Sequence, residues 1–151
     1  MKSTFKKEKI LKEKQKKISK VIKRIEKIEF FCSDSITRQN LHNLKYYYTL
    51  CEIAYKDLLK KIYSKNKQMT INVNQVYSVF KCFCFDFKED FLKNIFGSYN
   101  TDSARRLRNK ITHSMDIKNK DELNLKSTKY IKEMKEFLAN FKEGPNNGIS
   151  N

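Results

Sequence analysis

The stretch RRLRNKITHSM, residues 105–115, holds the side chains best suited to chemistry in this chain of 151 residues. His113 is one of only two histidines, and Arg108 and Asn109 precede it by five and four positions. A neutral imidazole can accept the proton of a ribose 2′-hydroxyl near pH 7, and a guanidinium can hold a phosphate and stabilise the charge that develops in the transition state. These groups are the ones that RNA cleavage without a metal ion requires.

On a helix with about 100° per residue, the apolar members of this stretch form one stripe that must face a protein core. They are Ala104, Leu107, Ile111 and Met115. Asn109 and His113 lie four positions apart on the polar face, so their side chains can touch, whereas Arg108 lies about 140° from His113 and depends on its length to reach the same phosphate. We expect Arg108, Asn109 and His113 to be catalytic. The residues expected to bind RNA around them are Arg105, Arg106, Lys110 and Thr112.

A single histidine does not readily act both as the base for the 2′-hydroxyl and as the acid for the leaving 5′-oxygen. A homodimer that brings two copies of this helix together across a two-fold axis would supply the second group, so the chemistry predicts an interface site. Spacing alone favours another interpretation, an exposed basic helix with an incidental histidine. The other histidine, His42, is expected at the surface or boundary of its own helix.

The segment RNKITH, inside LRNKITHS, resembles the R-x4-6-H motif of the HEPN superfamily, the higher eukaryotes and prokaryotes nucleotide-binding domains. Arg108 matches the motif arginine, Asn109 the polar residue that usually follows it, and His113 the histidine. As a fold, the resemblance spans roughly residues 37–142. One departure is Met115, which stands where a major toxin branch of the superfamily has a tyrosine two residues after the histidine.

The resemblance implies a helical bundle that dimerises with its motif helices facing each other. It also implies a metal-independent endoribonuclease that leaves a 2′,3′-cyclic phosphate. Many members of the superfamily serve in toxin–antitoxin pairs, abortive infection or other antiviral defence, and some lack activity and only bind.

The composition favours a polyanionic partner, nucleic acid first, because 33 Lys and Arg stand against 17 Asp and Glu, a formal charge of +16. The alternative is that the excess lysine only solvates the surface. No apolar run is long enough to cross a bilayer and the first residues lack a signal-peptide core, so we expect a cytoplasmic protein without a membrane partner. The three glycines provide no glycine-rich phosphate loop, and no cofactor is expected.

The cysteines predict reduced, buried thiols, because they lie among apolar or aromatic neighbours. They are Cys32, Cys51, Cys82 and Cys84. The C-x-C pair formed by Cys82 and Cys84 lacks a second Cys or His cluster, so no zinc site or other metal site is expected.

The apolar periodicity predicts an all-α bundle of about five helices with a long basic N-terminal helix. The length fits a single domain over residues 1–142, and the resemblance implies that this domain is HEPN-like. The helices are expected at residues 4–31, 37–64, 74–96, about 104–115 and 127–142. Residues 1–15 carry few apolar side chains and are expected to project or fray, and residues 143–151 to be a disordered tail.

The segments between the helices are read from turn-forming and polar residues. Residues 64–74 are expected to form a loop, in which a short strand at MTINV would have no obvious partner, and residues 116–124 a second loop. Gly97 is a plausible C-cap, with Asn100 or Thr101 capping the next helix. FKCFCFDF alternates with period two, as a strand would, but its length and helical neighbours favour a helix. Lys45 and residues 46–48 either line a nucleotide cleft or form rim and core.

Three functions fit these patterns. The first is a ribonuclease of HEPN type, and the second is a non-catalytic nucleic-acid-binding or regulatory protein whose basic first helix supplies affinity through counterion release. The third is an interaction module, such as a subunit of a defence complex or the partner of an antitoxin, in which residues 4–31 dock on another protein.

Overall fold

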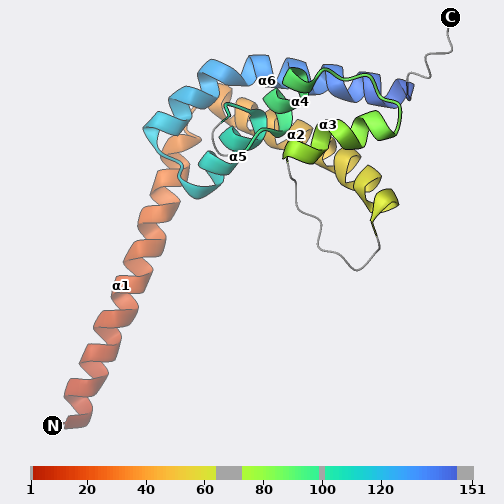
Figure 1. Ribbon diagram of the computed structural model, residues 1–151. Coiled ribbons are helices and arrows are strands. Elements are labelled where there is room, and N and C mark those ends of the chain that lie inside the picture. Colours follow the sequence, from red (N-terminus) through yellow and green to blue (C-terminus); the bar gives the residue numbers. More distant parts are fainter. Residues whose placement is uncertain (1, 64–72, 99–100, 146–151) are drawn as a thin grey trace, which may run out of the picture.

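The computed structural model describes residues 2–63, 73–98 and 101–145 and is all-helical over these ranges, with no strand in them (Figure 1). Its helices are α1 (Lys2–Phe31), α2 (Ser35–Ile62), α3 (Val73–Cys82), α4 (Glu89–Phe96), α5 (Ala104–His113) and α6 (Ile117–Glu143). The predicted all-α class is confirmed, with six described helices in place of about five. The predicted loop at 64–74 and the tail beyond residue 145 lie largely outside the described residues. None of the described helices is both long and apolar enough to cross a bilayer.

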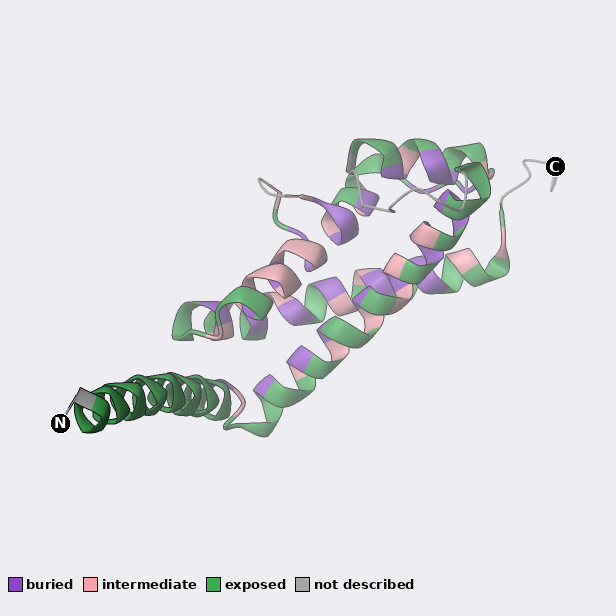
Figure 2. Ribbon diagram, turned by 90° about the horizontal axis from the view of Figure 1, so that it is seen from below, coloured by how far each residue is buried: buried purple, intermediate pink, exposed green. Residues whose placement is uncertain are grey.

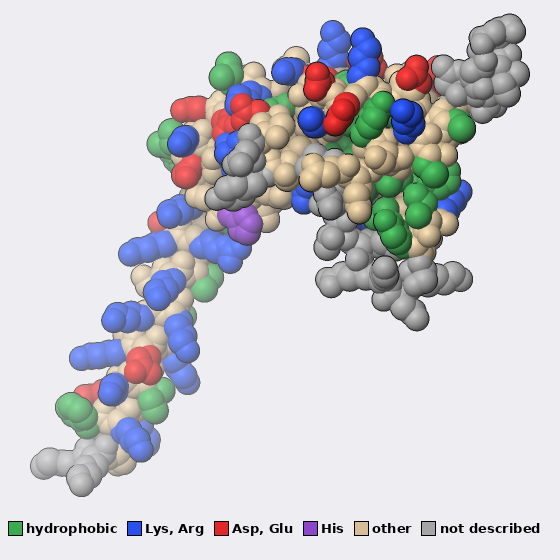
Figure 3. Space-filling model, in the orientation of Figure 1, with side chains coloured by type: hydrophobic (Ala, Val, Ile, Leu, Met, Phe, Trp, Pro, Cys, Tyr) green, Lys and Arg blue, Asp and Glu red, His purple; other side chains and the backbone are tan. Residues whose placement is uncertain are grey.

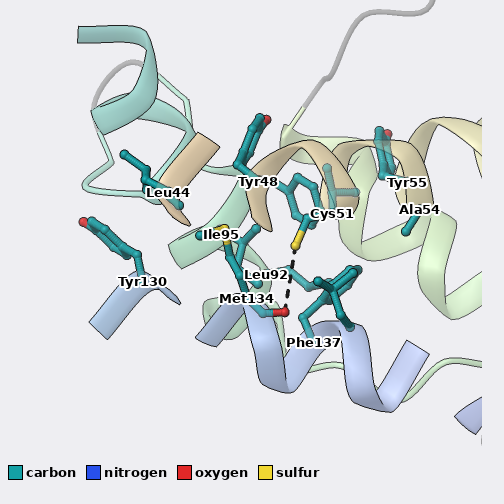
Figure 4. Packing of buried hydrophobic residues seen from close by; sticks show 14 of the residues in the cluster. Leu44, Tyr48, Cys51, Ala54, Tyr55, Leu92, Ile95, Tyr130, Met134 and Phe137 are labelled. Carbon is teal, nitrogen blue, oxygen red and sulfur yellow. Dashed lines mark hydrogen bonds between the residues drawn. The ribbon is translucent and has the colours of Figure 1, made fainter. Parts of the chain in front are cut away.

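The two long helices α2 and α6 run parallel and form the spine of the bundle (Figure 1). The N-terminal parts of the two helices contact each other through a hydrogen bond between Asn40 and Asn124. Further along both helices, the Cys51 thiol contacts the Met134 carbonyl. The apolar stripe of α2 has a spacing of three and four residues, so it faces α6 along the whole contact. Figure 4 shows Cys51, Met134 and Phe137 at the centre of this interface. The apolar stripe of α2, the most regular in the sequence, therefore forms part of the core.

The remaining short helices close the core with aromatic rings. Phe80 of α3 lies 5.3 Å from Phe137 and 5.4 Å from Phe87, both edge to face, and 5.9 Å from Tyr55, measured between ring centroids. Offset and edge-to-face contacts at these separations are the favoured arrangements of aromatic pairs. The phenylalanine-rich region is therefore core packing.

The prediction of one helix over residues 74–96 is wrong, because α3 ends at Cys82 and α4 begins at Glu89. Cys84 adopts a left-handed conformation (φ 67°), the Phe85 amide donates to the Phe80 carbonyl and the Cys84 amide to the Lys81 carbonyl. These two bonds define a Schellman C-cap, and the Phe80–Phe85 ring contact is its usual hydrophobic companion. After this cap, residues 85–88 alternate buried and exposed, so the period-two pattern in the sequence reports a real extended segment.

The prediction of buried cysteines holds only for Cys51. Cys32 is half-buried, and Cys82 and Cys84 are exposed because they sit at the turn that ends α3. All four are free thiols.

The prediction of a loop at residues 116–124 is also wrong, because α6 begins at Ile117. The Asp116 carboxylate caps the helix by accepting from the Asn119 amide at 2.8 Å. The buried stripe of α6 starts with Asn119 and includes Ser127, both buried, so apolar periodicity alone does not reveal its first turns.

Helix α1 projects from the bundle, and every side chain from residue 3 to residue 30 is exposed (Figures 1 and 2). Its final residue, Phe31, is buried and anchors the helix. Lys120 of α6 holds the same junction, because its ammonium pairs with Asp34 at 2.9 Å and lies 5.3 Å from the centroid of the Phe30 ring. Residues 2–31 carry twelve Lys and Arg against four Glu, a net charge of +8, half of the excess in the chain.

Candidate functional site

Helix α5 is fixed at its start by a cap that the sequence did not indicate. The Ser103 hydroxyl accepts from the Arg106 amide at 3.0 Å and donates to the Gly97 carbonyl at 2.7 Å. Thr101 does not cap the helix and Asn100 lies outside the described residues, so the expected N-cap is corrected to Ser103. Gly97 does form the C-cap of α4 as predicted, and a Cβ there would lie 2.4 Å from the Lys93 carbonyl oxygen.

The other end of α5 is fixed by Asn119, which sequence analysis placed in a loop. Its carboxamide donates to the Lys110 carbonyl at 3.2 Å and to the Ser114 carbonyl at 2.6 Å. The Lys110 carbonyl also accepts from the Ser114 amide at 2.8 Å, so the buried carboxamide adds a second bond to it and gives the Ser114 carbonyl, just beyond the helix, a partner. The helix therefore ends at His113 in a defined geometry. The only signal in the sequence was the spacing of Asn119 from Leu123 and Ser127.

His113 is exposed at this end of α5 and lies where two hollows meet. The first, the junction hollow, has a volume of about 360 Å³ and lies between α1 and the end of α5. Its walls are Lys20, Lys23, Arg24, Lys27 and Ile28 of α1, and residues 112–115. The second, the motif hollow, has a volume of about 690 Å³ and is lined by the polar side of α5, residues 97–98, Ser114 and Asn119.

Asn109 and His113 share the motif hollow, as expected from their spacing. Within the described residues, however, no hydrogen bond joins the two side chains, and the imidazole has no ion-pair partner. His113 is therefore exposed with neither ring nitrogen bonded to another described residue. Met115 is half-buried and packs against the core as predicted.

Arg108 does not line either hollow but turns toward α2. Its guanidinium carbon lies 4.4 Å from the centroid of the Tyr48 ring, and its Nη1 lies 3.8 Å from a Glu52 carboxylate oxygen. Its Nη2 also donates to Asn109 Oδ1 at 2.9 Å. Because the Asn109 oxygen is engaged in this way, the amide nitrogen of Asn109 is the group left to donate to a ligand. Arg108 thus orients Asn109 and stabilises the packing of α5 on α2.

Tyr48, under the guanidinium, is a core residue. Its side chain is fully buried, and burial raises the pKa of its hydroxyl, which has no hydrogen-bond partner among the described residues. The ring therefore stays neutral and offers its π face to Arg108. Lys45 and Tyr46 are exposed, and the Tyr46 ring stacks on His42 with 6.1 Å between the ring centroids.

The other cations predicted to bind RNA are engaged by groups of the protein itself. Arg105 donates to the Phe96 carbonyl at 3.4 Å, Arg106 pairs with Asp102 at 3.5 Å, and Lys110 pairs with Glu122 at 3.1 Å. All three still line the motif hollow. Thr112 is exposed in the junction hollow, with its hydroxyl donating to the Arg108 carbonyl at 2.9 Å.

Glu122 organises the charge beside α5. Burial raises the pKa of its carboxyl, but hydrogen bonds and charges from Lys110 and Lys126 outweigh burial, so the pKa lies below its ordinary value. Lys126 also pairs with Asp102 at 3.5 Å. The carboxylates of Glu122 and Asp102 therefore hold cations on and beside the basic side of α5 in place.

The structure adds four cations that sequence analysis had not linked with His113. These are Lys20, Lys23, Arg24 and Lys27, in the last turns of α1. Within the part of the chain that the structure describes, none of them has a hydrogen-bond or ion-pair partner. Figure 3 shows Lys and Arg side chains gathered along α1 up to the point where it joins the bundle. Sequence analysis missed the link because 86 residues separate Lys27 from His113.

No group of three or more His, Cys, Asp or Glu side chains in the described ranges is placed to hold a metal ion. Comparisons with protein-family models, with curated proteins and with solved structures found no match to this chain.

Proposed function

We propose that this chain is a metal-independent endoribonuclease of HEPN type, acting in a toxin–antitoxin pair or in antiviral defence. The observation that carries the proposal is the position of His113, exposed between two basic hollows at the end of the helix that bears the RNKITH segment. An exposed imidazole that no other described side chain engages is suited to general acid–base catalysis near pH 7. The role in defence comes from the resemblance of the motif.

In the proposed reaction, His113 accepts the proton of the ribose 2′-hydroxyl, and the resulting alkoxide attacks the neighbouring phosphorus. The 5′-oxygen leaves and the product ends in a 2′,3′-cyclic phosphate. The Asn109 amide nitrogen donates to a phosphate oxygen, and Arg108 holds Asn109 in place through the 2.9 Å hydrogen bond. The leaving oxygen needs a proton, for which a second copy of the chain would supply its own His113 across a two-fold axis.

The test is cleavage of a labelled single-stranded RNA by the wild type and by His113→Ala, with EDTA present throughout. We expect a loss of about 100-fold to 10,000-fold for His113→Ala, the usual contribution of a general acid or base. The matched control is His42→Ala, which removes the other exposed histidine and should cleave at the wild-type rate. The product should carry a cyclic phosphate, and RNA with a 2′-deoxy nucleotide at the scissile position should survive. Cleavage that persists in His113→Ala would exclude the proposal.

A second candidate function is binding of nucleic acid without catalysis. The observation that favours it is that the unpaired cations lie on α1, away from Arg108. This alternative predicts salt-sensitive RNA binding by a wild-type protein that cleaves no RNA.

A further inference from the structure

The cations near His113 fall into two groups that differ in their partners. Those of α5 are engaged by Glu52, Asp102, Glu122 or the Phe96 carbonyl. Those of α1 that line the junction hollow have no such partner among the described residues. A phosphate that approached α5 would compete with an existing contact, whereas one that entered the junction hollow would meet four cations of α1 that have no hydrogen-bond or ion-pair partner among the described residues.

We infer that the junction hollow binds the phosphates of single-stranded RNA, so that the last turns of α1 form part of the substrate site beside His113. This inference rests on the proposed function and deepens it, because it identifies the residues that hold the strand on one side of the scissile bond.

The geometry of α1 suits a strand rather than a single ion. Lys20, Lys23 and Lys27 lie within about 60° of one another on the helix, and the row spans about 10 Å along its axis, since each residue adds about 1.5 Å. Arg24 adds a planar donor at the edge of this row. Charges spread over such a length can contact more than one phosphate along a backbone.

The lining also fits a nucleotide. A volume of about 360 Å³ is at the lower end of the range of small-molecule sites. Ile28 and Met115 supply apolar wall against which a ribose or an unstacked base can pack. The hydroxyls of Thr112 and Ser114 donate to the Arg108 carbonyl and to Asp116, so they offer a ligand acceptor oxygens. The charge of Lys27 also contributes to lowering the pKa of Asp116, but this carboxylate does not line the junction hollow. The hollow therefore combines cationic, apolar and hydroxyl groups in one corner.

The test compares two variants with the same change in charge on the same helix. The junction variant replaces Lys20, Lys23, Arg24 and Lys27 by Gln, and the outer variant replaces Lys6, Lys9, Lys12 and Lys16 by Gln. Gln and Lys have similar helix propensities, so circular dichroism should show equal helix content. Binding is measured by fluorescence anisotropy with a 2′-O-methyl single-stranded RNA, which cannot form a cyclic phosphate.

We expect the junction variant to bind about tenfold or more weakly, with a salt dependence of log Kd reduced by about 2 to 3, because each phosphate contact on a single strand contributes about 0.7. The outer variant should lose less than about threefold. Equal losses in the two variants would overturn the inference, because they would mean that α1 acts only through its total charge. Binding of a duplex RNA as tight as that of the single strand would overturn the assignment to single strands.

The two proposals can fail separately. If the wild type cleaves RNA and the junction variant binds and cleaves like the wild type, the phosphate site is wrong and the nuclease stands. If the wild type cleaves no RNA, but the junction variant alone binds RNA more weakly by the expected amount, the phosphate site stands and the nuclease is wrong.

Discussion

Helices α5 and α1 are both strongly basic, but the structure uses their charges differently. On α5, Arg106 and Lys110 each contact a carboxylate, and Arg108 contacts a carboxylate, an amide and a ring at once. On α1 the cations of the junction hollow extend from a helix that has few neighbours. Paired cations fix the positions of side chains, and unpaired ones remain available to a polyanion. We therefore expect substitutions on α5 to change rate and stability, and those on α1 to change affinity.

Arg108→Ala should produce the largest effect that separates the two roles. It removes the hydrogen bonds to Asn109 and the contact with Tyr48, so we expect RNA cleavage to fall about 100-fold and the free energy of unfolding to fall by about 1 to 2 kcal/mol. The Kd for 2′-O-methyl RNA should change by less than about threefold, because the guanidinium lies outside both hollows.

Single-turnover cleavage, anisotropy and urea denaturation measure these three quantities. Arg106→Ala is the control, since its partner Asp102 is exposed, and it should leave stability within about 0.5 kcal/mol of wild type. If Arg108→Ala weakened RNA binding as strongly as it slowed cleavage, Arg108 would be a phosphate-binding residue and the contrast between the helices would be wrong.

Glu122→Gln should convert a paired cation of α5 into an unpaired one. Lys110 and Lys126 lose their shared carboxylate, so we expect RNA affinity to rise about twofold to fivefold with a steeper salt dependence. The free energy of unfolding should fall by less than about 1 kcal/mol, because both lysines are partly exposed.

Glu89→Gln, on α4, changes the net charge equally and serves as the control, since its partner Lys93 lies outside both hollows. Equal gains in affinity in the two variants would show that net charge, rather than release of Lys110, governs binding.

Lowering the pH should have the smallest effect on stability. It protonates Asp34 and Asp116, the carboxylates that cap the N-termini of α2 and α6. The pKa of Asp34 is lowered by hydrogen bonds from the Thr37 amide, Lys120 and the Thr37 hydroxyl, and that of Asp116 by bonds from the Asn119 amide and the Ser114 hydroxyl. A carboxyl with a lowered pKa in the folded state stabilises the fold fully above its unfolded pKa of about 4, and this contribution is lost as the pH falls through the folded value.

The contribution of Asp34 and Asp116 to the melting temperature should therefore be constant from pH 7 to pH 5. Below pH 4 the melting temperature should decline by roughly a few degrees as this contribution is lost. Asp34→Asn should flatten part of that decline in a thermal melt series. A decline as steep as that of the wild type would show that Asp34 does not contribute.

Periodicity predicted the parts of the fold in which every buried position is apolar. Helix α2 satisfies this condition from Leu41 to Leu58, and its boundaries agree closely with the structure. Residues 83–88 and the start of α6 do not satisfy it. A left-handed Cys84 replaces the glycine that usually marks a helix end, and the buried polar residues Asn119 and Ser127 interrupt the apolar pattern.

The site was predictable only as far as it is local in sequence. The spacing of Asn109 and His113 places both in one hollow, as expected for a helix. The contact of Arg108 with Tyr48 and the position of α1 beside His113 depend on how distant helices pack, which no spacing within residues 105–115 records.

The exposure of α1 links the conformational equilibrium of this helix to what it binds. Lysines four positions apart, such as Lys16 with Lys20 and Lys23 with Lys27, repel each other along a helix that has almost no tertiary packing to oppose fraying. A phosphate backbone bound there would relieve this repulsion, so RNA and helix content should stabilise each other reciprocally. A helix-breaking change near residue 10, far from any phosphate in the junction hollow, would then lower the affinity of the hollow without altering a residue that lines it.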